Sequence, residues 1–182
     1  RFSFDVWTSE QSLYDRGLVD QAIETLKEKG HTYQEEGALW FETTKYGDDK
    51  DRVLIKQDGS LTYLVPDIAN HDQKYKRGFD VIVDFFGADH HGYIPRLKAS
   101  MQAMGNNPDQ LHVDIIQMVR LVSEGIEVKM SKRLGNATTI NELCDNVGVD
   151  AARYFFVSRA LDSHLDFDVE SKIGRASCRE RV

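Results

Sequence analysis

Cysteine is scarce in this sequence. Its two cysteines, Cys144 and Cys178, give neither the spacing of a metal site nor a disulfide framework, which is typical of a protein of the reducing cytosol. Long apolar runs are also missing, because none approaches the ~20 residues of a membrane span. No signal-peptide pattern opens the chain. We therefore expect a cytoplasmic protein that makes no use of a membrane.

An excess of basic charge is absent as well. The formal net charge is -7 at pH 7, so the charge balance does not indicate a nucleic-acid-binding protein. Any contact with RNA would need a local basic patch or another domain. The length of 182 residues fits one domain of ordinary size with a sizeable core.

Both ends of the chain look unusual. The last residues, 173–182, break the acidic character of what precedes them and resemble the translated read-through of a sequencing adapter, so we exclude them from the fold. The chain opens in mid-pattern at Arg1, without a methionine. We interpret the sequence as an internal fragment of a longer protein.

One short stretch concentrates cationic side chains. Residues 128–136 read Val-Lys-Met-Ser-Lys-Arg-Leu-Gly-Asn. The apolar run 113–122 before it predicts a buried strand, and a helical pattern follows from about Thr139. A cationic loop that leaves a strand in an α/β pattern is where a phosphate would bind. A solvated basic turn is the alternative reading of a lone Lys-x-x-Lys.

The first third of the chain predicts helices and a small β insertion. Alternating apolar residues over 1–7 indicate a short strand, and helices are expected up to Arg16 and over 18–29, with Gly30 as the cap. Short β-prone runs separated by turns then predict an antiparallel sheet. The expected strands of this insertion are 38–41, 53–55 and 60–64. The charged residues between them are most simply a solvated loop without a metal site; they are Lys45, Asp48, Asp49, Lys50, Asp51 and Arg52.

From Pro66 onward the pattern alternates between helix and strand. A helix opens at Pro66 and ends at Gly78, a buried strand covers 79–86, and the next helix covers 93–104. This alternation predicts an α/β fold with a parallel sheet. Ligands of such sheets bind beyond the carboxyl ends of the strands, where residues 87–92 and 129–136 both lie.

The segment 87–92 contains three adjacent side chains of types that can bind a metal ion, Asp89, His90 and His91. Adjacent side chains diverge, so they are poorly placed to bind one ion, and we expect no metal here. Substrate contact fits better. Gly87 allows a close backbone approach to a nucleotide, and Asp89 at a strand end can accept hydrogen bonds from ribose hydroxyls.

Several separated segments together resemble bacterial arginyl-tRNA synthetase, a class I aminoacyl-tRNA synthetase. Lys-Met-Ser-Lys at 129–132 is similar to the class signature loop, although Arg133 stands where that signature usually has serine. Gly-Ala-Asp-His at 87–90 is similar to the Gly-x-Asp-Gln/His element of the class. Residues 63–69 and 150–156 match the family in the same order. The resemblance implies the second half of a Rossmann-like, parallel-sheet nucleotide-binding domain with a small antiparallel β insertion.

The resemblance also implies a reaction and its residues. The whole enzyme would use ATP and Mg²⁺ to form arginyl-adenylate and then transfer arginine to tRNA(Arg), acting as a monomer, and several members need bound tRNA before they activate arginine. The implied catalytic residues are Lys129, Ser131 and Lys132. The implied ATP-binding residues are Gly87, Asp89, Met118, Val119, Lys129, Met130 and Lys132. The implied arginine-binding residues are Tyr63, Asp67 and His90. No metal ligand is implied.

The sequence leaves open alternative roles for single residues and for the whole chain. Asp67 could be only an acid in the first turn of a helix, stabilised by the helix dipole by ~0.3–1 kcal/mol. His71 could orient Asp67 or be a plain surface histidine. For the whole chain, another class I synthetase or a nucleotidyltransferase would keep Lys132 and Asp89 without needing Tyr63 and Asp67. A non-catalytic nucleotide- or RNA-binding paralogue is a further alternative. The expected divisions of the chain are 1–30, 31–64, 65–160, a linker over 161–172 towards an anticodon-binding domain, and the foreign tail 173–182.

Overall fold

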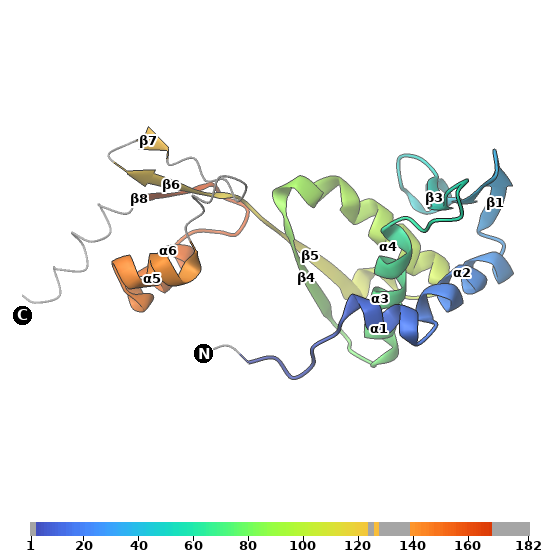
Figure 1. Ribbon diagram of the computed structural model, residues 1–182, viewed down its shortest axis with the longest axis horizontal. Coiled ribbons are helices and arrows are strands. Elements are labelled where there is room, and N and C mark those ends of the chain that lie inside the picture. Colours follow the sequence, from blue (N-terminus) through green and yellow to red (C-terminus); the bar gives the residue numbers. More distant parts are fainter. Residues whose placement is uncertain (1–2, 124–125, 128–138, 169–182) are drawn as a thin grey trace, which may run out of the picture. The chain divides into compact units, whose positions relative to one another are not determined.

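The structure is a computed structural model that describes residues 3–123, 126–127 and 139–168 (Figure 1). The chain divides into two compact units, which are described separately. The first comprises Arg1–Asp84 and His90–Val113, and the second comprises Phe85–Asp89 and Asp114–Val182. No helix among the described residues is long and apolar enough to cross a membrane.

The expected strand at the amino terminus is not formed over the residues described there. Residues 3–9 are outside any helix or strand, and Trp7 is 81% exposed with its ring against the edge of Phe4. Alternation alone does not make a strand, because the backbone groups also need a pairing partner. The first element is instead helix α1, Glu10–Asp15, within the range where the sequence predicts a helix up to Arg16.

Helix α2, Leu18–Glu28, confirms the amphipathic helix that the sequence predicts. Its buried residues are Val19, Ala22, Ile23 and Leu26. Gly30 follows in the left-handed region at φ 70°, where its N–H donates to Lys27 O at 2.9 Å and ends the helix.

The insertion forms a three-stranded antiparallel sheet in the order β1-β2-β3. The strands are β1 (Thr32–Glu35), β2 (Ala38–Phe41) and β3 (Arg52–Ile55). The expected strand 60–64 is wrong, since only Leu61 forms a bridge, to Ile55, and Leu64 already belongs to the next helix. Asp58 shapes the predicted turn by accepting the Ser60 N–H at 2.9 Å. After the bridge at Leu61 the Thr62 N–H still donates to Leu54 O at 2.9 Å, and the chain then turns directly into the next helix, so no longer ladder forms.

The sequence predicted that the charged loop of the insertion is solvated, but part of this loop is buried. It contains the 3-10 helix η1 (Thr43–Tyr46) and then Asp48, whose side chain is only 2% exposed. Arg52 donates to both Asp48 carboxylate oxygens, at 2.7 and 2.8 Å. Burial opposes ionisation of this carboxylate, but the hydrogen bonds from Arg52 outweigh it and lower the pKa of Asp48 from 3.8 to about 2.

We expect Asp48→Asn to lower the free energy of unfolding by about 2 kcal/mol at pH 7. Because the folded-state pKa is depressed, this contribution is complete above pH 3.8 and is lost as the pH falls through about 2. Urea unfolding of the wild type and of Asp48→Asn over this pH range measures the difference in the free energy of unfolding. Asp49→Asn is the matched control, since Asp49 also pairs with Arg52 but is 76% exposed, so its loss should cost less than ~1 kcal/mol. Equal losses for both variants would contradict the buried pair.

Helices α3 and α4 form the core of the first unit with α2. Helix α3, Leu64–Lys76, begins two residues before the expected Pro66, and helix α4 is Ile94–Met104. Both predicted helices are thus confirmed with small shifts of their ends. The largest fully buried apolar side chains of these helices are Val19, Leu26, Val65, Ile68, Leu97 and Met101.

Strands β4 (Ile82–Gly87) and β5 (Leu111–Ile116) are hydrogen-bonded neighbours in a two-stranded sheet. Both were expected to be buried runs, but burial alternates along each of them, and Phe85 is 60% exposed. A strand is buried throughout only where both faces of its sheet are covered. The 3-10 helices η2 (Ala88–Tyr93) and η3 (Pro108–Gln110) flank α4 in the chain.

The second unit contains a three-stranded sheet in the order β7-β6-β8. Its strands are β6 (Val119–Ser123), β7 (Ile126–Glu127) and β8 (Leu165–Asp168). Strands β6 and β8 are parallel, which confirms a parallel pairing in an α/β chain. The single strand expected over 113–122 is wrong, because the chain leaves the β4–β5 sheet after Ile116 and enters another sheet at Val119.

Helices α5 (Ile140–Val147) and α6 (Val149–Val157) complete this unit. Thr139 and Glu142 form a capping box at the start of α5, where the sequence placed a helix. Gly148, at φ 83°, separates α5 from α6, so the helical pattern that starts near Thr139 forms two helices. The apolar core of the unit is Leu121, Leu143, Val147, Ala152, Phe155 and Phe167. Phe156 is exposed, although its ring centroid lies 5.8 Å from that of Phe167.

Candidate functional site

Two of the predicted arginine-binding residues lie one turn apart at the start of α3. Tyr63 is the residue before the helix and is 88% exposed. Asp67 is half-buried in the first turn, and its N–H points to Tyr63 O at 3.5 Å. Asp67 also lines a small polar cleft of about 120 Å³. The other residues of this cleft are Thr8, Glu10, Leu13, Pro66 and Asn70.

The carboxylate of Asp67 is held by a residue that the sequence analysis did not single out. The hydroxyl of Tyr93 donates to Asp67 Oδ2 at 2.6 Å. Burial raises the pKa of Tyr93, and the hydrogen bond to the Asp67 carboxylate raises it further. The phenol therefore stays a neutral donor. No local pattern indicates this contact, because the two residues are 26 positions apart and meet only in the folded chain.

His90 joins the same group. Its exposed ring packs edge-on against Tyr93, with 6.5 Å between the ring centroids. Tyr63, Asp67 and His90 are thus connected through Tyr93 and the start of α3. His91 is exposed on the same 3-10 helix. Of the three residues that the resemblance assigned to arginine, Asp67 and His90 both contact Tyr93, and the exposed Tyr63 lies one helical turn before Asp67.

His71 is a buried residue of the helix core and not a plain surface histidine. Its Nδ1 lies 2.7 Å from the Asp67 carbonyl oxygen, and its Nε2 lies 2.5 Å from Asp84 Oδ2. The ring of His71 thus contacts the backbone carbonyl of Asp67, whereas the Asp67 carboxylate is contacted by Tyr93. Lys74 Nζ also donates to Asp84, at 2.6 Å. Burial opposes ionisation of Asp84, but these hydrogen bonds outweigh it, so the pKa of Asp84 lies below its ordinary value.

Two predicted ATP-binding residues, Gly87 and Asp89, contact each other closely. A Cβ atom added at Gly87 would lie 2.7 Å from Asp89 Oδ1. A side chain at position 87 would therefore require the Asp89 carboxylate to shift, whereas glycine leaves it in place at the end of β4. Glycine at 87 therefore has a structural reason besides the expected approach of a nucleotide.

The remaining predicted ATP-binding residues belong to the second unit or are not described. Met118 is 70% exposed between β5 and β6, and Val119 begins β6, where it pairs with Leu165. The preceding Gln117 N–H donates to Leu161 O at 2.9 Å. The proposed catalytic loop lies outside the described residues, so the structure does not test its assignments. These assignments concern Lys129, Met130, Ser131 and Lys132.

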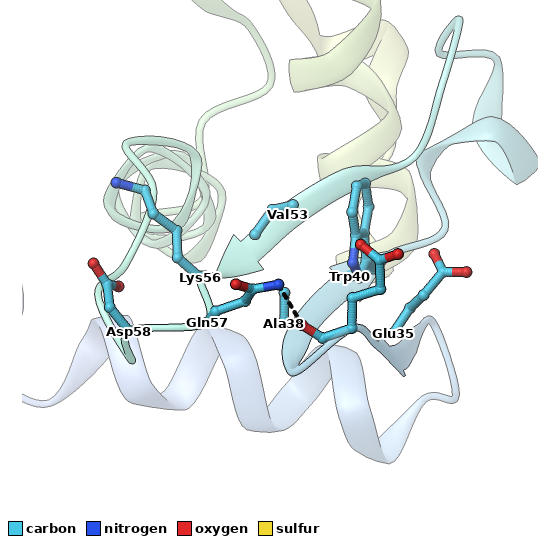
Figure 2. A pocket seen from close by; sticks show the side chains of 8 residues that line it. Glu35, Ala38, Trp40, Val53, Lys56, Gln57 and Asp58 are labelled. Carbon is cyan, nitrogen blue, oxygen red and sulfur yellow. Dashed lines mark hydrogen bonds between the residues drawn. The ribbon is translucent and has the colours of Figure 1, made fainter.

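A second cavity, of about 390 Å³, lies against the insertion sheet (Figure 2). Gln57 Nε2 donates to Glu36 O at 2.6 Å there, and the carboxylates of Glu35 and Asp58 stand at opposite ends of the group in this view. The lining residues are Glu35, Glu36, Ala38, Trp40, Val53, Lys56, Gln57 and Asp58. None of them was predicted to bind a ligand.

Within the described part of the chain, no group of three or more His, Cys, Asp or Glu side chains is arranged to hold a metal ion. We expect the purified protein to carry no stoichiometric zinc, because Asp89, His90 and His91 are predicted to serve substrates. Elemental analysis after dialysis measures the content directly. A value near one zinc per chain would contradict the assignment of these residues to substrate binding.

The sequence matches the family described as tRNA synthetases class I (R), catalytic domain, over residues 2–168. The arginine–tRNA ligase of Anoxybacillus flavithermus is 56% identical over 177 residues, which are 97% of this chain and 32% of that protein. The arginine–tRNA ligase of Bacillus subtilis is 54% identical over the same shares of the two chains. The chain thus spans about a third of the length of these curated relatives.

Solved structures agree with these sequence matches. A Campylobacter jejuni structure assigned as an arginyl-tRNA synthetase has a TM-score of 0.84 and 41% sequence identity, and the match covers 93% of this chain and 36% of that one. The arginyl-tRNA synthetase of Thermus thermophilus has a TM-score of 0.70 at 16% identity, with 86% of this chain and 36% of that one covered. At that identity the second match supports the fold alone.

Proposed function

Because this chain belongs to the family of class I tRNA synthetase (R) catalytic domains, we propose that it is part of an arginine–tRNA ligase. The observation that carries the proposal is the identity of 54–56%, over 97% of the chain, to proteins named arginine–tRNA ligase. The chain covers 32% of those relatives, so the activity proposed is that of the longer protein. We further propose a cytoplasmic, monomeric enzyme.

The arrangement around Asp67 suits the amino-acid substrate. A guanidinium group is planar, always charged and best bound by a carboxylate through charge-assisted hydrogen bonds. Asp67 offers a carboxylate at the edge of a polar cleft, with the exposed ring of Tyr63 one turn away. We assign Asp67 to the guanidinium and Tyr63 and His90 to the surroundings of the bound arginine.

The second substrate is ATP. In the activation step, the arginine carboxylate attacks the α-phosphate and pyrophosphate leaves, so negative charge develops on the phosphate oxygens. We propose that Lys129 and Lys132 stabilise this charge, with Ser131 in the same loop, and that Mg²⁺ enters bound to the ATP phosphates. Gly87 and Asp89 would contact the nucleoside, and Met118 and Val119 would lie along the adenine. Transfer of arginine to tRNA(Arg) completes the reaction.

Aminoacylation of tRNA by the full-length protein tests the proposal. The assay supplies ATP, Mg²⁺ and bulk tRNA with each of the standard amino acids in turn, and tRNA is present throughout. We expect charging with arginine alone. Charging with another amino acid would indicate a different class I synthetase. A protein that charges nothing yet binds nucleotide would be a non-catalytic paralogue.

A further inference from the structure

The hydrogen bond between Tyr93 and Asp67 has features expected of a contact that orients a ligand-binding carboxylate. Among the described residues, Tyr93 is the one hydrogen-bond donor to the Asp67 side chain, and it uses only Oδ2. The two residues come from different elements, η2 and α3, of the same compact unit. The contact therefore depends on how these elements pack.

Tyr93 is itself contacted over its ring by a second residue. The guanidinium carbon of Arg96 lies 5.0 Å from the ring centroid, a cation–π contact. Arg96 Nε lies 3.8 Å from Asp48 Oδ2, and Asp48 is bound by two hydrogen bonds from Arg52. A continuous series of contacts thus runs from the loop of the β insertion to the carboxylate of Asp67.

The chemistry of the donor matters for a guanidinium site. A lysine or arginine in place of Tyr93 would neutralise the carboxylate and weaken its attraction for a cationic ligand. The half-buried phenol of Tyr93 fixes one oxygen of the carboxylate and leaves its negative charge intact, because partial burial and the hydrogen bond to Asp67 raise the pKa of Tyr93 and keep the hydroxyl protonated. Oδ1 of Asp67 then remains available to the ligand.

We propose that Tyr93 is a positioning residue that fixes the Asp67 carboxylate in the orientation that receives the guanidinium of arginine. This inference rests on the proposed function, and it adds a residue that contacts Asp67 and not the substrate. It also connects the insertion to the site, since Arg96, which covers the ring of Tyr93, lies 3.8 Å from Asp48 of the insertion. A freely rotating carboxylate would lose orientational entropy on binding, which the hydrogen bond removes in advance.

Tyr93→Phe in the full-length protein tests the proposal, because it removes the hydroxyl and keeps the ring that Arg96 covers. We expect the KM for arginine to rise about tenfold, while the KM for ATP and kcat stay within about twofold. Tyr75→Phe is the matched control. It also loses a hydroxyl hydrogen bond made by a tyrosine of the first unit, to Asn107 O at 2.9 Å, and should leave the KM for arginine unchanged.

A double-mutant cycle separates positioning from a general effect on folding. In an Asp67→Ala background, Tyr93→Phe should raise the KM for arginine no further, because the carboxylate that it orients is gone. An equal rise in both backgrounds, or no rise in the wild-type background, would overturn the role of Tyr93 while the proposed function stands. A wild-type protein that does not use arginine would instead overturn the proposed function, and the positioning role with it.

Discussion

Lys132→Ala should lower the rate of arginyl-adenylate formation by the full-length protein by about 10²–10³. One preorganised group that stabilises developing charge in a transition state contributes about this factor. The KM for arginine should change little, because Lys132 is assigned to phosphate and not to the amino acid. Pre-steady-state formation of adenylate, in the presence of tRNA, measures the rate directly.

Lys27→Ala is the control for this substitution. Lys27 is an exposed lysine of α2 whose ammonium pairs with Glu24 at 2.8 Å, so its removal changes the net charge by the same amount. We expect adenylation by this variant to match the wild type. Near wild-type adenylation by Lys132→Ala as well would mean that the Lys-Met-Ser-Lys segment is only a solvated basic turn, and the catalytic assignment would fail.

Asp67→Ala should raise the KM for arginine by about 10–100-fold. Charge-assisted hydrogen bonds contribute about 1.5–3 kcal/mol each, and the guanidinium would lose its carboxylate partner. The KM for ATP should stay near that of the wild type. Steady-state aminoacylation at varied arginine and varied ATP separates these two effects.

The alternative role of Asp67, a charge that stabilises the first turn of its helix, has a matched control in the same unit. Asp20 is an exposed acid in the first turn of α2 and has the same relation to its helix dipole. Asp20→Ala should share any small loss of stability but leave the KM for arginine unchanged. If Asp67→Ala also left that KM unchanged, Asp67 would be a helix-terminal charge and nothing more.

Helices were predictable from the sequence wherever the pattern is local. The spacing of Val19, Ala22, Ile23 and Leu26 indicates α2 before any tertiary contact is known, and these are the residues that the structure buries. The strands were less predictable, because pairing is decided by distant segments. Nothing in the apolar run over 113–122 indicates that the chain changes sheets between Ile116 and Val119.

In the candidate site, too, local relations could be predicted from the sequence and tertiary contacts could not. Tyr63 and Asp67 are separated by one helical turn, so their spacing alone places them together. Tyr93 could not be assigned to them, since its contact arises only from the packing of η2 against α3. The loop of the insertion was expected to be solvated because its composition is charged, whereas the pairing of Asp48 with Arg52 allows a carboxylate to be buried.

The central claim is that the carboxylate of Asp67 binds the guanidinium of arginine. A crystal structure of the full-length protein with bound L-arginine measures this most directly. We expect a guanidinium nitrogen about 2.7–2.9 Å from the Asp67 carboxylate, which still accepts the hydrogen bond from the hydroxyl of Tyr93. A bound arginine whose guanidinium lies beyond hydrogen-bond distance of Asp67 would contradict it.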